Sequence, residues 1–339
     1  MESTIFGGDL TQVEGDHLVL LTKAEQHELQ CLLDQTLVNP YEDIEQFILQ
    51  AKLIFHELPK RIRRRLVEFQ KSGNLQGAVL VRGLPVDPAL PMTPSDSRRC
   101  PSKITWASEL WSTVFSTPFG DLISYAQEKD GEIFQNICPT PKNAKMLSSE
   151  SSSTLLDFHT EVAFHPFMPD YLSLYCLRQD HDRVARTLVA GVRKIDPLLT
   201  PSQRLVLQQP VFETGIDFSF GSPNAKQGGG LVCPVFYGDN SDPYIRFDPD
   251  LMIGKTDEAS EIIRILKSIV NQVADYVLLE PGDLLIVDNR RAVHARTEFT
   301  ARYDGKDRWL QRTCIVRSLV DSAVDRRHGE RIIRTEFAV

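Results

Sequence analysis

Residues 154–165 have the sequence Thr154-Leu155-Leu156-Asp157-Phe158-His159-Thr160-Glu161-Val162-Ala163-Phe164-His165, and this stretch predicts most about the fold and the site. Apolar and polar side chains alternate through its middle, as in a β-strand with one buried face. Side chains on a strand repeat every two residues, so we expect His159 and Glu161 to point into the same space. An imidazole and a carboxylate placed in this way are two candidate metal ligands. A histidine in a strand is more often structural, so this pair alone does not establish a metal site.

A third candidate ligand lies far downstream. The apolar run Leu284-Leu285-Ile286-Val287 leads toward His294, and we expect residues 284–294 to form a strand that ends at this histidine. Two histidines and one carboxylate on one side of a cation are the ligand set of non-haem Fe(II) oxygenases, which leave positions open for a co-substrate and dioxygen. An all-oxygen set would instead favour magnesium or calcium. The three residues together therefore favour iron.

The composition excludes several classes of protein. A chain of 339 residues with 42% hydrophobic residues can form one large domain or two ordinary ones. Its formal charge of −8 argues against a nucleic-acid partner. The sequence has neither the pattern of a signal peptide nor an apolar run of membrane-spanning length, so we expect a soluble, cytoplasmic protein with no membrane partner. The six cysteines form no Cys-x-x-Cys pair and are expected to be reduced.

The order of the predicted elements indicates an α+β protein. Apolar residues at helical spacing predict helices within 23–73 and over 106–115, 195–207 and 256–277. Short apolar or alternating runs predict strands at 77–85, 132–137, 170–177, 186–192, 231–236, 244–248, 284–294 and 308–317. Many short strands with helices outside them favour a double-sheet barrel of the jelly-roll kind, which holds ligands in its mouth.

Two arginines in the last predicted strand, Arg308 and Arg312, are placed to face the same side. A guanidinium is the usual bidentate partner of a carboxylate held in a fixed orientation, so two of them suggest two carboxylate-bearing ligands. The alternative is a pair of surface arginines bonded to acidic neighbours such as Asp304 or Asp307.

Three segments resemble the clavaminate-synthase-like Fe(II)/2-oxoglutarate oxygenases, and the closest likeness within that family is to bacterial hydroxylases of free amino acids. The resemblance extends from Gly77 to about Arg317, and its segments are 153–164, 287–299 and 302–312. It implies a distorted double-stranded β-helix (jelly-roll, cupin-like) core over 76–320, with flanking helices and an N-terminal helical segment over 1–75, in a single oxygenase domain over 1–339. The sequence does not decide whether the chain forms a homo-oligomer.

The resemblance also implies the cofactors. Iron would be held by His159, Glu161 and His294, with 2-oxoglutarate and O2 as co-substrates, and Arg308 would hold the distal carboxylate of 2-oxoglutarate. Oxidative decarboxylation to succinate and carbon dioxide would then be coupled to hydroxylation of an unactivated carbon. By contrast, His165 is not expected to bind the metal but to support a metal ligand or the fold.

The resemblance implies three substrate-binding residues. Arg312 would hold the α-carboxylate of the amino acid, Glu128 its α-amino group, and Asp248 its side chain. Glu150 has no counterpart in the family's pattern, but Asp248 together with Glu150 would provide the negative charge that a lysine ammonium needs. Two loops, 148–153 and 221–230, would close over the site, although a plain linker is the more common interpretation of serine-rich sequence.

This chain departs from the family's pattern in two places that bear on the substrate. Arginine hydroxylases have a second acid where this chain has Arg246, and the asparagine enzyme has a side-chain amide where this chain has Val162. The run 242–252 is similar to that of lysine hydroxylases. We therefore expect a free basic amino acid, L-lysine, hydroxylated at C3 or C4, with L-arginine or asparagine as alternatives. Outside the family, a metal-dependent hydrolase or isomerase and a non-catalytic ligand-binding barrel stay open.

Overall fold

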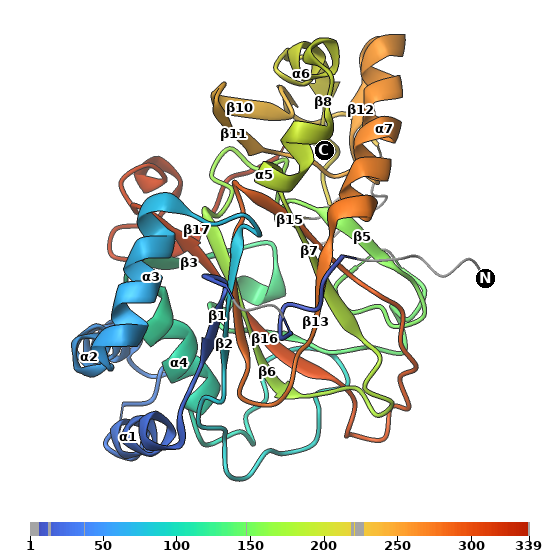
Figure 1. The fold of residues 1–339 in the computed structure, drawn as a ribbon. Helices are drawn as coiled ribbons and strands as arrows, with labels where there is room; N and C mark the ends of the chain where they lie inside the picture. The colour runs from blue at the N-terminus through green and yellow to red at the C-terminus, as the bar shows by residue number, and fades with distance from the viewer. Residues whose placement is uncertain are drawn as a thin grey trace.

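Two β-sheets form the centre of the molecule in the computed structural model (Figure 1). The structure describes residues 7–12, 15–36, 38–146, 148–217, 220 and 227–337. The larger sheet has the strand order β1-β2-β14-β6-β16-β3-β17, with β4 paired to β16. Its strands are β1 (Leu18–Leu20), β2 (Ala78–Arg82), β3 (Asp121–Tyr125), β4 (Gln135–Ile137), β6 (Tyr171–Arg178), β14 (Leu284–Asp288), β16 (Trp309–Val316) and β17 (Ile332–Ile333).

The smaller sheet is antiparallel throughout and has the order β13-β7-β15-β5. Its strands are β5 (Leu156–His159), β7 (Arg186–Gly191), β13 (Asp275–Leu278) and β15 (Ala292–Arg296). Two short sheets lie beyond it, formed by β8 (Phe212–Glu213), β9 (Val232–Cys233) and β12 (Ile253–Gly254), and by β10 (Phe236–Asp239) and β11 (Asp242–Ile245).

A hydrophobic cluster joins the two central sheets face to face. Leu174 and Leu285 of the larger sheet share this cluster with Val189 and Val277 of the smaller one. Neighbouring residues on the same strands face the other way, because side chains alternate along a strand. The two sheets therefore bury one face against each other and offer their outer faces to helices.

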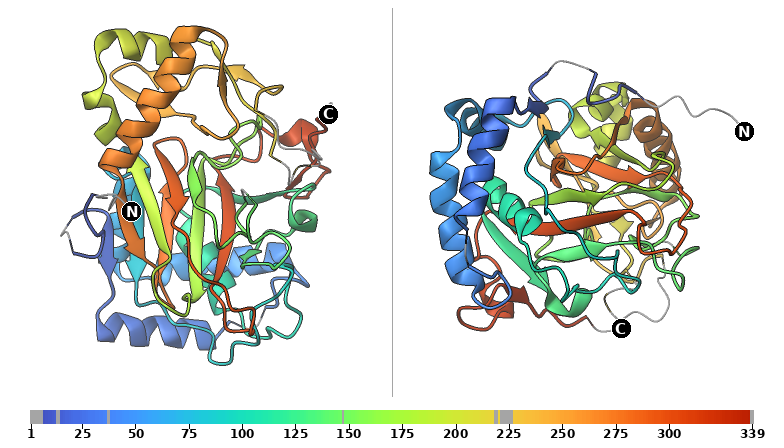
Figure 2. Two further views of the ribbon diagram at one scale, coloured as in Figure 1. Left: turned by 90° about the vertical axis from the view of Figure 1, so that its right-hand side faces the viewer. Right: turned by 90° about the horizontal axis from the view of Figure 1, so that it is seen from below.

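Helices cover both outer faces (Figure 1 and Figure 2). The hydrophobic cluster outside the larger sheet includes Val79 and Val81 of β2 and the buried faces of α1 (Lys23–Asp34), α2 (Ile44–Glu57), α3 (Lys60–Ser72) and α4 (Ala107–Ser116). The cluster outside the smaller sheet includes residues of α5 (Val192–Ile195), α6 (Pro201–Leu207) and α7 (Asp257–Val273). Three 3-10 turns complete the described elements: η1 (Lys129–Gly131), η2 (Asp196–Leu198) and η4 (Ala323–Asp325). Within the described residues, no helix is both long and apolar enough to cross a membrane.

Several predicted boundaries were wrong for local reasons. The helix predicted over 195–207 is divided into α5, η2 and α6 around Pro197, which has no backbone N–H to donate. The helix predicted to reach residue 277 ends at Val273, and the apolar residues that follow it belong to β13. The strand predicted over 244–248 ends at Ile245.

The stretch 154–165 is not one strand. Strand β5 ends at His159, and the chain then enters a turn in which Val162 has a positive φ of 53°. A continuous strand cannot contain such a residue, and a positive φ is strained for a β-branched side chain. Glu161 therefore reaches the site from a turn, so its position does not follow from strand alternation.

The stretch 284–294 also divides into two strands. β14 belongs to the larger sheet and β15 to the smaller one, and a turn over 289–291 carries the chain between them. The Asp288 carboxylate accepts a hydrogen bond from the backbone N–H of Arg290 (3.1 Å), which is typical of an Asp that begins a turn. His294 consequently lies in the middle of a strand.

Candidate functional site

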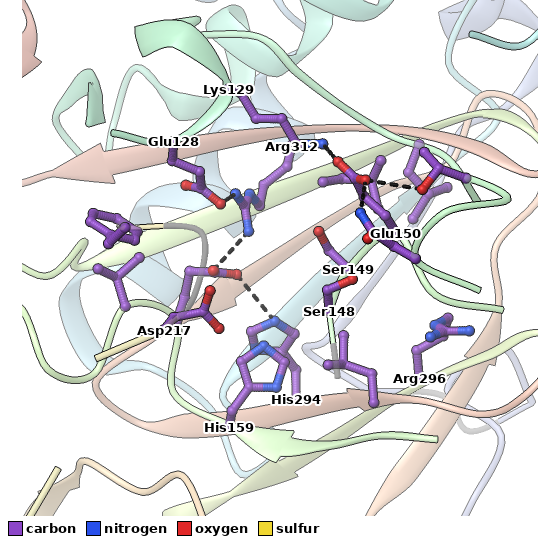
Figure 3. A pocket seen from close by; sticks show the side chains of 18 of the residues that line it. Glu128, Lys129, Ser148, Ser149, Glu150, His159, Asp217, His294, Arg296 and Arg312 are labelled. Atoms are coloured by element: carbon purple, nitrogen blue, oxygen red, sulfur yellow. Dashed lines mark hydrogen bonds and ion pairs between the residues drawn. The ribbon is translucent and has the colours of Figure 1, made fainter. Parts of the chain in front are cut away.

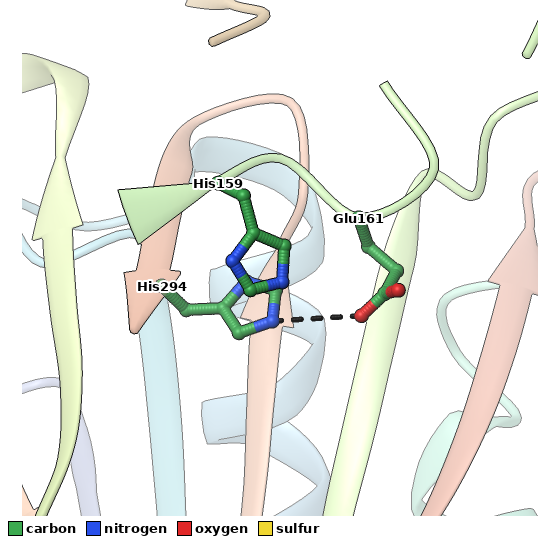
Figure 4. A group of neighbouring side chains, drawn as sticks. All are labelled: His159, Glu161 and His294. Atoms are coloured by element: carbon green, nitrogen blue, oxygen red, sulfur yellow. Dashed lines mark ion pairs between the residues drawn. The ribbon is translucent and has the colours of Figure 1, made fainter. Parts of the chain in front are cut away.

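The two histidines meet because β5 and β15 are antiparallel neighbours. His159 pairs directly with His294 across the sheet, and their ring centroids are 4.3 Å apart (Figure 4). The Glu161 carboxylate completes the group, with its Oε2 atom 3.5 Å from Nε2 of His294. Candidate ligand atoms of all three residues lie within 4.8 Å of one another. These positions allow a single metal ion to contact all three side chains.

Hydrogen bonds fix the orientation of the candidate ligands. Nδ1 of His159 donates to the carbonyl of Asp157 (2.8 Å), which leaves Nε2 free to bind a metal. The side chain of Asn289 holds the Glu161 turn from both sides. Its Oδ1 accepts from the backbone N–H of Glu161 (2.8 Å), and its Nδ2 donates to the carbonyls of Glu161 (3.0 Å) and Pro169 (2.9 Å). The sequence analysis placed Asn289 within one strand over 284–294, and its long-range role was missed.

The electrostatics of the group suit a divalent cation. Burial and the neighbouring His159 lower the pKa of His294 to about 4, so this imidazole is neutral at physiological pH. Burial acts to raise the pKa of Glu161, but the charge of Arg312 and the hydrogen bond with His294 hold it well below its ordinary value. Neutral imidazole nitrogens and an ionised carboxylate are the donors that Fe(II) accepts. The residues present therefore fit this metal.

The group opens into a cavity of about 580 Å³ between the two central sheets (Figure 3). This volume falls in the range of small-molecule binding sites. All eight residues predicted from the sequence line this cavity: Glu128, Glu150, His159, Glu161, Asp248, His294, Arg308 and Arg312. His165 is fully buried among aromatic rings outside the cavity lining, as expected of a structural histidine.

Arg312 joins the metal group to one wall of the cavity. Its Nη1 donates to Oε1 of Glu161 (2.7 Å), its Nη2 pairs with Glu128, and its Nε donates to Gln135 (3.0 Å). Burial acts to lower the pKa of Arg312, but the two carboxylates hold it well above its ordinary value. The idea that this residue is a surface arginine bonded to Asp304 or Asp307 is wrong.

A second cationic region is built from Arg308 and Arg296. Both side chains are buried, and neither forms an ion pair with any residue that the structure describes. The one hydrogen bond that Arg308 makes in the described chain joins its Nη2 to Oγ1 of Thr187 (3.3 Å). Burial lowers the pKa of Arg308, and burial together with Arg308 lowers the pKa of Arg296 to about 9. Arg296 was missed, although it follows His294 by two residues and so shares its face of the strand.

The acids of the cavity differ in their partners. Glu150 pairs with Lys129 and accepts hydrogen bonds from Asn143 (2.7 Å) and Thr140 (3.2 Å). Asp248 forms no ion pair within the described chain, and its Oδ1 accepts only from backbone N–H groups. Burial raises its pKa to about 6. Asp248 is thus a carboxylate without a cationic partner.

Two loops approach the cavity. Ser148, Ser149 and Glu150 of the serine-rich loop line it, as does Asp217, which the sequence did not single out. Of the other predicted loop, residues 221–226 lie outside the described part of the chain.

The donor set and the buried arginines fit a non-haem iron oxygenase with a carboxylate-bearing co-substrate. Residues 232–314 match the family model of the taurine catabolism dioxygenases TauD and TfdA. The chain belongs to the clavaminate-synthase-like Fe(II)/2-oxoglutarate oxygenases, because it is 36% identical over 289 residues to clavaminate synthase 2 of Streptomyces clavuligerus, covering 85% of this chain and 89% of that protein.

Two further comparisons concern amino-acid hydroxylases. The L-lysine 3-hydroxylase of Catenulispora acidiphila is 32% identical over 325 residues, which cover 95% of this chain and 90% of that protein. A solved asparagine oxygenase in complex with Fe(II), 2S,3S-3-hydroxyasparagine and succinate matches with a TM-score of 0.85 at 34% identity, covering 94% of this chain and 100% of that one. Enzymes of this family use Fe(II), 2-oxoglutarate and O2. The protein is therefore an oxygenase of the amino-acid hydroxylase type.

Proposed function

We propose that the protein hydroxylates an unactivated side-chain carbon of a free basic amino acid, and that this amino acid is L-lysine, hydroxylated at C3 or C4. The observation that carries the proposal is the Asp248 carboxylate, which lines the cavity without a cationic partner among the described residues. A lysine ammonium is a compact charge that one carboxylate can pair with. Bound there, it would also offset the cost of keeping the half-buried Asp248 carboxylate ionised.

The metal group and the arginines take the remaining roles in this proposal. His159, Glu161 and His294 hold Fe(II), which supplies the activation of dioxygen when it is bound. Arg308 holds the distal carboxylate of 2-oxoglutarate, since its buried guanidinium has no acidic partner in the described chain. Arg312 binds the α-carboxylate of the amino acid. These contacts place the substrate carbon beside the metal and displace water from the cavity.

Glu128 and Glu150 contribute to substrate binding in different ways. Glu128 is paired with Arg312, so the two together form a complementary site for the α-amino and α-carboxylate groups of a free amino acid. Glu150 lines the cavity, but Lys129, Asn143 and Thr140 already occupy its oxygens. We therefore assign the pairing with the lysine ammonium to Asp248 and a weaker, longer-range attraction to Glu150.

Two positions support lysine over the alternatives. Arg246 occupies the position at which arginine hydroxylases have a second acid, and its side chain does not line the cavity. The guanidinium of an L-arginine substrate would therefore meet only the Asp248 carboxylate, whereas those enzymes offer two carboxylates. Val162 lines the cavity with an apolar side chain that cannot hydrogen bond an asparagine amide. L-Arginine is the second candidate, because a single carboxylate can still accept its fork of N–H donors. The likeness to the lysine 3-hydroxylase is consistent with the first choice.

We also propose that the two facing sheets are the two sides of a distorted double-stranded β-helix in a single domain. Residues 76–320 would form this core, and residues 1–75 its helical cover. The support is the hydrophobic cluster that α1, α2 and α3 share with β2 and β14.

Two measurements test the proposed function. Anaerobic addition of Fe(II) and 2-oxoglutarate should give a visible metal-to-ligand charge-transfer band, and succinate release across the twenty amino acids should be greatest with L-lysine. In Asp248→Asn the KM for lysine should rise about 10- to 100-fold, the value of one charge-assisted hydrogen bond, while the band persists. Asp239→Asn, at the exposed end of β10, is the matched control and should leave KM unchanged. An unaltered lysine KM in Asp248→Asn would overturn the assignment of substrate.

A further inference from the structure

Arg296 is the buried group of the cavity to which the proposed function gives no role. It shares the cavity with the metal group and with Arg308, and it forms no ion pair with an acid of the described chain, where Glu298 acts on its charge only from a longer distance. We propose that Arg296 is a specificity and positioning residue for the oxoacid co-substrate. Its charge, buried beside Arg308, selects 2-oxo acids that carry a second carboxylate. This inference rests on the proposed assignment of Arg308.

The first argument is the chemistry of its partners. Nη2 of Arg296 donates to Oγ of Ser151 (2.7 Å) and to the carbonyl of Thr154 (3.2 Å), and Nη1 faces the carbonyls of Ser152 (3.5 Å) and Thr297 (3.4 Å). All four acceptors are neutral. Its Nε is buried and has no hydrogen-bond partner in the described chain. The guanidinium is thus held firmly in place while its charge stays available to an anion.

The second argument is the pairing of like charges. Arg296 and Arg308 flank the same aromatic ring, with their guanidinium carbons 5.2 Å and 5.9 Å from the centroid of Phe299. The charge of Arg308 acts on Arg296, so the two buried cations repel each other, and removing them from water is costly unless an anion is bound nearby. A single carboxylate bound near Phe299 would be attracted by both charges. The second cation therefore strengthens binding only for a ligand that brings its own distal negative charge.

The third argument is the position of the segment that Arg296 holds. Residues 151–154 include the end of the serine-rich loop (148–153) and lead into β5, the strand that carries His159. The hydrogen bonds from Arg296 hold this segment in place, so the guanidinium lies where the loop that lines the cavity leads into β5. Ser151→Ala would remove one of these bonds and keep the charge. That variant separates the electrostatic role from the structural one.

The test compares two co-substrates of equal length. 2-Oxoglutarate and 2-oxovalerate differ in that the second has a methyl group in place of the distal carboxylate. Dissociation constants for both come from anaerobic titration of the Fe(II) protein, followed by the charge-transfer band. In Arg296→Met the dissociation constant for 2-oxoglutarate should rise about 10-fold or more and that for 2-oxovalerate less than about 3-fold, as expected for loss of one charge-assisted contact. Arg296→Gln, which is neutral but still donates hydrogen bonds, should behave in the same way.

Two control variants define the outcome. Ser151→Ala and Arg291→Met, which removes an arginine paired with Asp242 outside the cavity lining, should both keep the wild-type preference for 2-oxoglutarate. Equal weakening of both oxoacids in the Arg296 variants, or no weakening, would overturn the inference and leave a structural role. If Arg296→Met does not fold, the same two dissociation constants measured in Arg296→Gln decide between the roles. A wild-type protein without the charge-transfer band would instead contradict the proposed function itself.

Discussion

Replacement of Asp248 by Asn should make the metal-free protein more stable at alkaline pH. Burial raises the pKa of Asp248 from an ordinary value of 3.8 to about 6. A carboxyl with a raised pKa in the folded state opposes folding once it is ionised, so stability falls as the pH rises from about 4 through about 6. A pKa raised by about two units lowers the free energy of unfolding by about 3 kcal/mol above pH 7, and by about 1 kcal/mol at pH 4.5. The neutral amide removes this penalty and keeps the oxygen that accepts the backbone N–H groups.

The assay is urea unfolding with a chelator present, at pH 8 and at pH 4.5. The free energy of unfolding of Asp248→Asn should exceed that of the wild type by up to about 3 kcal/mol at pH 8, and the gain should shrink to about 1 kcal/mol at pH 4.5. Asp239→Asn, at an exposed position, should show no such gain. A variant no more stable than the wild type at pH 8, or a gain independent of pH, would refute the reasoning.

Three other substitutions have defined outcomes. Asn289→Ala removes the bonds that fix the Glu161 turn and should weaken Fe(II) binding about 10- to 100-fold in an anaerobic titration. Arg312→Met leaves two buried carboxylates without their cation and should destabilise the protein by about 3–5 kcal/mol in urea unfolding, with Arg312→Lys milder. Gly120→Ala should lower the melting temperature by several degrees, because Gly120 has a φ of +144° and an added Cβ would lie 2.0 Å from the carbonyl oxygen of Val316. A melting temperature equal to that of the wild type would contradict this prediction.

The sequence predicted the residues of the cavity better than the backbone that places them. His159 and His294 were recognisable because their chemistry is specific. Arg308 and Arg312 were identified because four residues on a predicted strand keep a common face, but Arg308 lies just before β16, and the pairing of that strand shifts between Trp309 and Leu310. The reason given for Glu161 was wrong, since a turn rather than a strand presents it. Turn geometry there depends on Asn289, which is distant in sequence and bonds across to the Glu161 backbone.

The sequence could not reveal the pairing of charges. Arg296 looked like any strand residue, and nothing local shows that its hydrogen-bond partners are all neutral acceptors. Glu150 looked like a free loop acid, whereas the structure pairs it with Lys129. Such pairings form between segments that come together only in the folded chain. Predictions from local pattern therefore identify the residue types of a site but miss which charges stay available.

The contacts of Arg312 have a consequence for the cost of ligand binding. Its guanidinium is already bonded to Glu161, Glu128 and Gln135 before any ligand is present. A free arginine side chain loses about 2 kcal/mol of rotamer entropy when it is immobilised, and here that loss is part of folding. The residue is preorganised, so an arriving carboxylate meets a cation already in a fixed orientation. Affinity for a small substrate can then be reached with few contacts.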